Sequence, residues 1–224
     1  MSTFVERKVT CPHCGVDEER TIAESLNGPR VPDVVDAILG GRFQTFMCSG
    51  CRGEYVVDSP LVYLDFDAGH WLHMFRREDE ANWAACEAEA DRTFVQTMEV
   101  HAPPMVREWA ARMVRRTVFG LGALREKLAL IRAGLDDAAL EAMKLDMLRR
   151  TEAFSWRPEA PIRLVAVLDD GLRFEQFDSD DVVTVPREWL DHVAAAAEWA
   201  SARDAVAAGS YVDIGRTAGV VATV

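Results

Sequence analysis

Long apolar runs are missing from this 224-residue sequence. No stretch approaches the roughly 20 uninterrupted apolar residues that a membrane-spanning helix needs, so we expect no membrane contact. Residues 1–6 also lack the basic and then apolar pattern of a secretory signal peptide. Basic residues are the minority, with 25 Lys and Arg against 37 Asp and Glu and a net charge of −12. We therefore expect a cytoplasmic protein whose generally acidic surface repels phosphate backbones.

Signatures of common catalytic sites are missing as well. The sequence holds no Gly-x-Ser-x-Gly elbow, P-loop, dinucleotide-binding glycine pattern or His-Glu-x-x-His pair. His70 and His73 form the only close histidine pair, and on a strand they would face opposite sides, so shared ligation would require a turn there. We expect a protein that is not an enzyme. Metal chemistry, or chemistry at these two histidines in a cleft, is the alternative.

Cysteine is scarce, with five in the chain, yet four of them form two pairs with C-x-x-C spacing. Each pair can bend into a tight turn, here called a knuckle, that points two thiolates at one ion. Zn²⁺ prefers four ligands in a tetrahedron, and Cys₄ is a common structural solution. We predict one structural Zn²⁺ per chain, held by Cys11, Cys14, Cys48 and Cys51. Thiol exchange and a rubredoxin-like iron site are the alternatives.

The residues around the cysteine pairs carry further expectations. Gly15 and Gly53 follow the pairs, and we predict a positive φ at both because such turns favour glycine. His13 lies between two predicted ligands, and we interpret it as a solvent-exposed filler, with a hydrogen-bonding role beside the site as the alternative. The fifth cysteine, Cys86, falls in an alanine-rich helical segment and is expected to be a small buried hydrophobe.

The N-terminal third alternates strand-like segments with the two knuckles. We expect strands over 3–10, 16–23, 42–47 and 55–57, a short helix over 33–39, and two further strands over 60–66 and 71–75. This order is typical of a zinc ribbon with a helical insertion. The first predicted domain therefore spans residues 1–75.

Particular residues of this segment resemble a known family. Cys11-Pro12-His13-Cys14 at the end of a strand, the Phe46–Cys51 knuckle and the Leu61–Asp65 segment are similar to the bacterial CpXC domain. The resemblance covers about residues 1–75. It implies zinc ligation by the four paired cysteines and implies no particular activity. Ser49 stands where the family often has proline, which leaves the ligands in place. Abundant arginine and alanine are also typical of a GC-rich bacterial genome.

The predicted middle domain, residues 76–155, is expected to be helical. Helix-forming residues fill 76–92 and 105–116. Leucines and methionines at three- and four-residue spacing from 121 to 147 predict a helical hairpin with one apolar stripe on each arm. These stripes are expected to be core, with a homodimer seam as the alternative.

Basic side chains gather in this middle domain. Arg112, Arg115 and Arg116 would share one face of the predicted 105–116 helix. We interpret this Arg107–Arg116 face as a solvated surface paired with nearby acids. Nucleic-acid binding through the face is the alternative, although no aromatic stacking pattern accompanies the arginines.

The predicted C-terminal domain, residues 156–224, has an α+β pattern. Strands over 162–168 and 172–177 flank an Asp-Gly turn, which is typical of a β-hairpin. An acidic turn at 178–181, a strand over 182–185 and one long helix over 186–207 follow. The whole chain is thus predicted to be an α+β protein that binds zinc and acts as a non-catalytic interaction module for an unknown protein partner or a second copy of itself.

Overall fold

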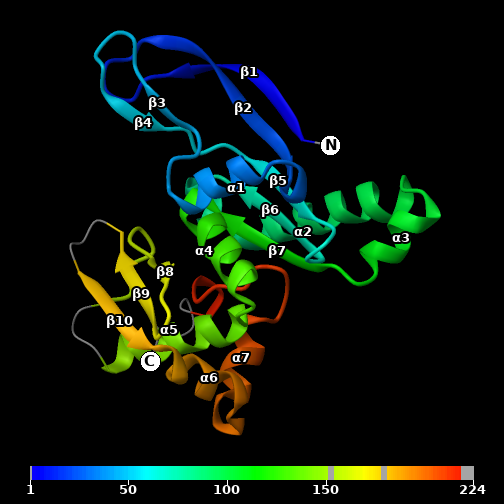
Figure 1. The fold of residues 1–224 in the computed structure, drawn as a ribbon, viewed down its shortest axis with the longest axis vertical. Helices are drawn as coiled ribbons and strands as arrows, with labels where there is room; N and C mark the ends of the chain where they lie inside the picture. The colour runs from blue at the N-terminus through cyan, green and yellow to red at the C-terminus, as the bar shows by residue number, and fades with distance from the viewer. Residues whose placement is uncertain (1, 151–153, 178–180, 218–224) are drawn as a thin grey trace. The chain divides into compact units, whose positions relative to one another are not determined.

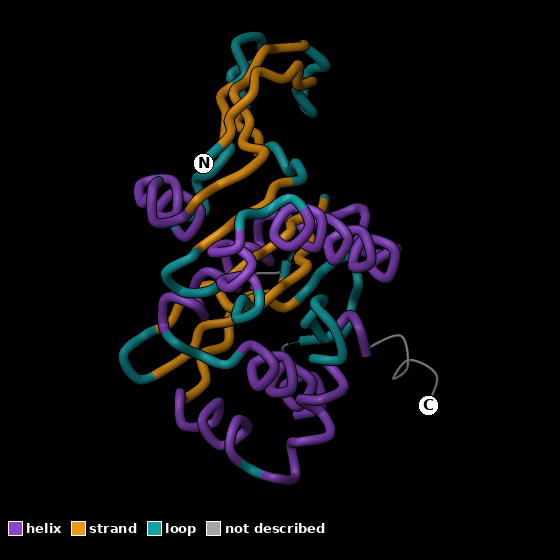
Figure 2. Tube along the Cα trace, turned by 90° about the vertical axis from the view of Figure 1, so that its right-hand side faces the viewer, coloured by secondary structure: helices purple, strands orange, loops and turns teal. Residues whose placement is uncertain are grey.

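The structure is a computed structural model that describes residues 2–150, 154–177 and 181–217. The described residues form a mixed α+β fold with three sheets, as Figures 1 and 2 show, which confirms the predicted class. The chain divides into two compact units, residues 1–124 and 125–224. The division falls inside helix α4 (Gly120–Ala133).

Unit 1 is built on a sheet made, in spatial order, of β1 (Thr3–Thr10), β2 (Asp17–Asn27), β5 (Leu61–Asp65), β6 (His70–Phe75) and β7 (Val114–Phe119). The β1–β2 and β5–β6 pairs are antiparallel, whereas β2–β5 and β6–β7 are parallel. On β6, Trp71, Leu72 and Met74 are at most 5% exposed. Because β6 is buried on both faces, apolar residues and the buried His73 occupy both of them, and the strand lacks an apolar–polar alternation.

The connection from β6 to β7 covers one face of this sheet. It runs through the 3₁₀ turn η2 (Arg77–Asn82), α2 (Trp83–Phe94), the π-helical turn η3 (Val95–Val100) and α3 (Pro104–Ala110). Trp71 of β6 meets Phe94 of α2 edge-on, with ring centroids 5.4 Å apart. Met98 and Ala110 are buried in the same cluster, so η3 and α3 also pack on the Trp71 face.

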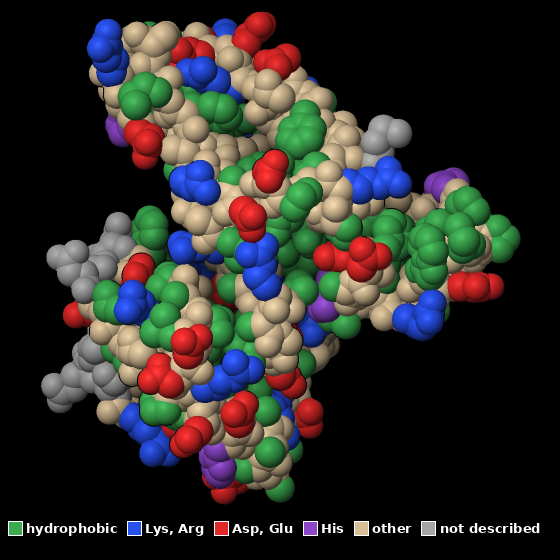
Figure 3. Space-filling model, viewed as in Figure 1, with side chains coloured by type: hydrophobic (Ala, Val, Ile, Leu, Met, Phe, Trp, Pro, Cys, Tyr) green, Lys and Arg blue, Asp and Glu red, His purple; other side chains and the backbone are tan. Residues whose placement is uncertain are grey.

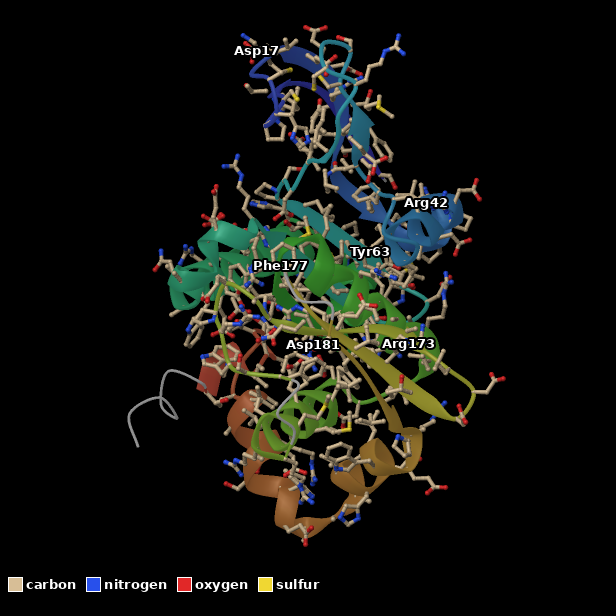
Figure 4. The ribbon with its side chains drawn as sticks, turned by 90° about the vertical axis from the view of Figure 1, so that its left-hand side faces the viewer. Asp17, Arg42, Tyr63, Arg173, Phe177 and Asp181 are labelled. Atoms are coloured by element: carbon tan, nitrogen blue, oxygen red, sulfur yellow. The ribbon has the colours of Figure 1, made fainter. Side chains whose placement is uncertain are left out.

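The other face of the sheet is approached by η1 (Gly28–Arg30), which leads into α1 (Pro32–Leu39). Tyr63 pairs with Leu72 across β5 and β6, so its side chain lies on the face opposite Trp71 (Figure 4). A Cβ at Gly28 would lie 2.1 Å from the Tyr63 hydroxyl oxygen. Only glycine therefore allows η1 to pack this closely on the sheet. Helix α1 matches the predicted helix and ends at Gly40.

The β1–β2 hairpin extends beyond the rest of the sheet (Figures 1 and 2). Within β2, Ser25, Leu26 and Asn27 pair with β5. The residues of β2 before Ser25 pair with β1 and not with β5. The short antiparallel pair β3 (Thr45–Met47) and β4 (Glu54–Val56) lies beside the far end of this hairpin. The order of strands and knuckles in this region agrees with the prediction.

Unit 2 combines a helical hairpin with an antiparallel sheet of order β10-β9-β8. Its elements are the rest of α4, then α5 (Asp137–Arg150), β8 (Ile162–Val167), β9 (Gly171–Gln176), β10 (Val182–Pro186), α6 (Arg187–Ala195), η4 (Ala197–Trp199) and α7 (Ala200–Val206). Leu140 and Met143 of α5 pack with Phe174 of β9 and Val193 of α6 in one buried core. Asp136 accepts two backbone N–H groups at the start of α5 and thereby caps the helix.

Unit 2 also buries a set of charged side chains, here called the buried ion network. Lys144 lies 2.8 Å from Glu126 and 3.0 Å from Glu141, and all three side chains are fully buried. Arg163 lies 2.6 Å from Asp213 and 3.5 Å from Glu126. Glu141 also accepts the backbone N–H of Ile214. Within the described residues, the network includes Glu126, Lys127, Asp137, Glu141, Lys144, Arg163 and Asp213. It fastens the C-terminal segment around residue 213 to α4, α5 and β8.

Two predicted helices are wrong. The 105–116 helix ends at Ala110, and the chain then enters β7, because parallel pairing with β6 outweighs the local helical preference of this segment. The 186–207 helix is interrupted at Ala196, whose ψ of 135° is extended. Arg203 of α7 donates to the backbone carbonyls of Val193 and Ala196, which satisfies the acceptors that the interruption leaves.

The predicted domain boundaries, 75/76 and 155/156, do not coincide with the division after Leu124. β7 belongs to the same sheet as β1, so the N-terminal fold cannot close before residue 119. The predicted acidic turn at 178–181 lies largely outside the described residues, as does the end of the tail from 218 to 224. Among the described residues, no helix combines the length and apolar character that crossing a membrane requires.

Candidate metal centre

The structure brings the four thiols of the two C-x-x-C pairs together. Their Sγ atoms all lie within 4.8 Å of one another, and this is the one such group of potential metal ligands in the described part of the chain. Cys11 Sγ lies 3.9 Å from Cys51 Sγ, and Cys14 Sγ lies 3.5 Å from Cys48 Sγ. In a tetrahedron with Zn–S bonds of ~2.3 Å, the sulfur atoms are about 3.8 Å apart. The cluster therefore has nearly the dimensions of a Cys₄ metal site.

The cluster is buried on one side and exposed to solvent on the other. Cys11 and Cys48 are each 1% exposed, and with Tyr55 they form a small buried core. Cys14 and Cys51 are exposed. The apolar residues that pack against this core are Val9, Phe46 and Val57. An ion among the four thiols would thus be shielded from solvent by the β1 and β3–β4 strands on one side.

The first knuckle forms where β1 ends. The Cys11 N–H donates to the Val16 carbonyl at 2.8 Å, and the Gly15 N–H donates to the Cys11 carbonyl at 3.0 Å. Gly15 has a φ of +73°, which confirms the prediction for this position. Only glycine adopts this conformation without cost, so the residue fixes the turn that directs both thiols to one point.

The second knuckle repeats these bonds with a different residue at the turn. The Cys48 N–H donates to the Gly53 carbonyl at 3.0 Å, and the Arg52 N–H donates to the Cys48 carbonyl at 2.9 Å. Arg52, not Gly53, has the positive φ, at +60°, so that prediction is wrong. Gly53 instead allows a close approach, because a Cβ there would lie 2.8 Å from His13 Cδ2. Its N–H also points at Cys51 Sγ, 3.4 Å away.

His13 joins the two knuckles. Its Nε2 lies 2.9 Å from the Glu54 carbonyl oxygen at the start of β4. Because a carbonyl only accepts, Nε2 carries the proton and donates it. His13 is solvent-exposed, as predicted, but its hydrogen bond to Glu54 shows that it is more than a filler. The alternative, a hydrogen-bonding role beside the site, fits the structure.

Two charged residues of β2 brace the second knuckle, and sequence reasoning missed them. Glu18 accepts the Ser49 N–H at 2.9 Å, and hydrogen bonding to Ser49, with help from Arg20, lowers the pKa of Glu18 to about 2. Arg20 lies 2.8 Å from Glu18 and donates to the Met47 carbonyl at 2.7 Å. The only signal in the sequence was the spacing of Glu18 and Arg20, because residues two positions apart on a strand share a face.

The pKa values of the thiols depend on their burial, on nearby backbone N–H groups and on one another. Burial opposes ionisation of Cys11, yet N–H groups of His13 and Cys14 and the neighbouring thiols lower its pKa to about 7. For Cys14, the Val16 N–H favours the thiolate, but the Cys48 thiol and burial raise the pKa to about 12. Adjacent thiolates repel, so the cluster keeps protons unless a cation compensates the charge. A divalent ion would supply that compensation and displace the protons.

The other sequence candidates lie apart from this cluster. Cys86 is 9% exposed on α2, and burial raises the pKa of its thiol, which agrees with a small buried hydrophobe. His70 and His73 belong to one regular strand, so they face opposite sides and the turn that shared ligation requires is absent. His73 stacks on Phe75 with centroids 4.5 Å apart, and burial lowers its pKa to about 4.

The predicted Arg107–Arg116 face does not exist as one surface of a helix. Arg107 lies on α3, Arg112 lies in the turn after it, and Arg115 lies on β7. Arg115 pairs with Asp91 at 3.2 Å and lies over the Phe94 ring at 5.1 Å. A row of arginines directed at a phosphate backbone is therefore not formed.

Comparison with known proteins adds one finding. A family model described as CpXC protein matches residues 9–144, which is more than half of the chain. The match includes both cysteine pairs and continues past residue 75 through α2, α3 and most of α5. No curated protein and no solved structure gave a significant match.

Proposed function

We propose that this chain, which belongs to the CpXC family, binds one zinc ion as a structural metal and that it functions by binding another protein. The observation that carries the proposal is the group of four Sγ atoms within 4.8 Å of one another. Cys11, Cys14, Cys48 and Cys51 would hold the ion in a zinc-ribbon-like arrangement of β1, β2, β3 and β4. When bound, the ion supplies positive charge that keeps all four thiolates together.

Zinc is favoured by the ligand set. Four thiolates in a tetrahedron form the common structural zinc site, although iron accepts the same ligands. The N–H group of Gly53 directed at Cys51 supports the charge of a bound thiolate. The metal would join the tip of the β1–β2 hairpin to the β3–β4 pair, whose short strands bury little apolar surface by themselves.

A structural rather than catalytic role is favoured because the protein fills all four ligand positions. Catalytic zinc sites keep one position for water or substrate. The described side chains near the cluster brace the backbone: His13 holds Glu54, and Glu18 holds Ser49. None of these contacts presents an acid or base to an open coordination position. Protein binding is the remaining class of function that suits a domain held rigid by such a site.

The first test is the metal content of the protein purified without added metal. We expect one zinc per chain and four thiols protected from a thiol reagent until the zinc is chelated. Cys48→Ser should lose the zinc and loosen the segment from β1 to β4, because metal binding and local folding are coupled. Cys86→Ser is the matched control, since Cys86 lies on α2 outside the cluster, and it should keep full zinc content. Iron, or full zinc content in Cys48→Ser, would overturn the proposal.

A further inference from the structure

Helix α3 and the residues that flank it expose large apolar side chains. Val100 and Met105 are 57% and 59% exposed, and Trp109 and Val114 are also exposed. Figure 3 shows hydrophobic side chains gathered over α3. The helix follows the π-helical turn η3, and such turns are frequent at functional sites. These four residues, with the cavity beside them, are called the α3 surface.

The cavity is open to solvent and lies where α3 meets the turn between β5 and β6. It has a volume of about 300 Å³, with Phe66, Trp109 and Met113 among its apolar lining. The Phe66 and Trp109 rings are tilted, with centroids 4.9 Å apart. Ligand pockets range from about 300 to about 1,000 Å³, so this cavity suits one large side chain rather than a nucleotide cofactor.

Two charged groups also line the cavity. They are Arg112 and Asp67. Neither side chain has an ion-pair or hydrogen-bond partner among the described residues. The same is true of the Arg107 side chain on the adjacent α3. A guanidinium without a partner next to an aromatic cavity favours a ligand that has a carboxylate beside an apolar group. Asp67 would repel a carboxylate on its own side, so it would fix the direction in which such a ligand lies.

We propose that the α3 surface binds a short acidic segment of a partner protein. One large apolar side chain of the segment fills the cavity between Phe66 and Trp109, and neighbouring carboxylates pair with Arg112 and Arg107. The inference rests on the proposed role in protein binding and names its surface, but it does not depend on the metal. Buried aromatic anchors with arginine beside them are the residues that dominate binding energy at protein interfaces.

The size of the surface favours a short segment over a second copy of the chain. α3 has seven residues and is therefore about 10 Å long. A stable interface between folded proteins buries about 800 Å² on each partner, which is more than one short helix offers. Nucleic acid is disfavoured because Asp67 and Glu108 would lie against the phosphates.

The test uses a fluorescein-labelled peptide, Gly-Ser-Asp-Phe-Asp-Ser-Gly, and measures fluorescence anisotropy with the full chain. We expect saturable binding, and a peptide with alanine in place of phenylalanine should bind about tenfold more weakly. Trp109→Ala should weaken binding about tenfold and Arg112→Gln about fivefold. Arg42→Gln is the matched control: Arg42 is an exposed arginine after α1 (Figure 4), and its replacement should leave the affinity unchanged.

Each outcome decides the proposal. Equal binding of a peptide with lysine in place of aspartate, or equal loss in Arg42→Gln and Arg112→Gln, would overturn it. Binding of a single-stranded oligonucleotide instead of the peptide would also overturn it. Zinc content is measured on every sample, so that peptide binding without zinc would refute the metal site alone. Full zinc content without peptide binding would refute the α3 surface alone.

Discussion

The buried ion network of unit 2 makes the stability of that unit depend on pH. The network contains four carboxylates and three cations, and all of them except Asp137 are buried. Burial raises the pKa of Glu141 to about 7, against the opposing attraction of Lys144. A carboxyl whose pKa is higher in the folded than in the unfolded state destabilises the fold as pH rises between the two values. The perturbation that isolates this effect is Glu141→Gln, because glutamine cannot ionise.

The size of the effect follows from the pKa difference. The pKa of Glu141 is raised from an ordinary 4.5 to about 7, and at ~1.4 kcal/mol per pKa unit this corresponds to about 3 kcal/mol lost between pH 5 and pH 8. The glutamine oxygen can keep the bond from Lys144, but its amide group cannot accept the Ile214 N–H, which costs about 1 kcal/mol at every pH. Glu141→Gln should therefore be about 1 kcal/mol less stable than the wild type at about pH 5 and about 2 kcal/mol more stable at about pH 8.

The assay is urea unfolding at both pH values. Unfolding is monitored by hydrogen exchange in peptides from α5, so that unit 2 is observed separately. The difference between the variant and the wild type cancels the other groups that titrate in this range. They include His73, whose pKa is lowered to about 4 by burial. A variant that is destabilised equally at both pH values would refute the reasoning. It would mean that Glu141 is already ionised at pH 5 and that the neighbouring cations compensate its charge.

Three further predictions concern unit 1. Gly53→Ala should weaken zinc binding about fivefold to tenfold, because its Cβ displaces the His13 ring, and the loss should disappear in a His13→Ala background when both are titrated against a chelating dye. Zinc binding at about pH 7 should release about three to four protons per ion and should weaken as pH falls, because the thiols must ionise. Calorimetry in buffers of different ionisation enthalpy measures this release. Gly28→Ala should destabilise unit 1 by about 1–3 kcal/mol through its clash with Tyr63, and Tyr63→Leu should recover part of that in chemical unfolding.

Local signals were enough to predict the strands and knuckles around the cysteines. C-x-x-C spacing fixes the thiols within one turn, and the flanking segments have strand patterns, so residues 3–10 and 55–57 were placed nearly as found. The positive φ at Arg52 was missed because Gly53 follows it and glycine is the usual residue in that conformation. Gly53 leaves room for the ring of His13, a residue 40 positions earlier, so its role could not be predicted from neighbouring residues.

The larger errors came from contacts between distant residues. Val114–Phe119 follows a segment with helical spacing, and its partner β6 precedes it by about 40 residues, so no local pattern identified β7. The sequence analysis assigned no role to Glu126 and Lys144, yet both side chains are fully buried and pair with each other. The first domain was therefore ended too early, and the ionic character of the second core was not expected.

The central claim is that four thiolates hold one zinc ion, and X-ray absorption at the zinc edge tests it most directly. The account predicts four sulfur neighbours at about 2.3 Å and none from oxygen or nitrogen. The four Sγ atoms within 4.8 Å of one another already allow this geometry with little movement. Three or fewer sulfur neighbours together with an oxygen would contradict the account, because the site would then have an open position and the protein would belong with metal-dependent enzymes.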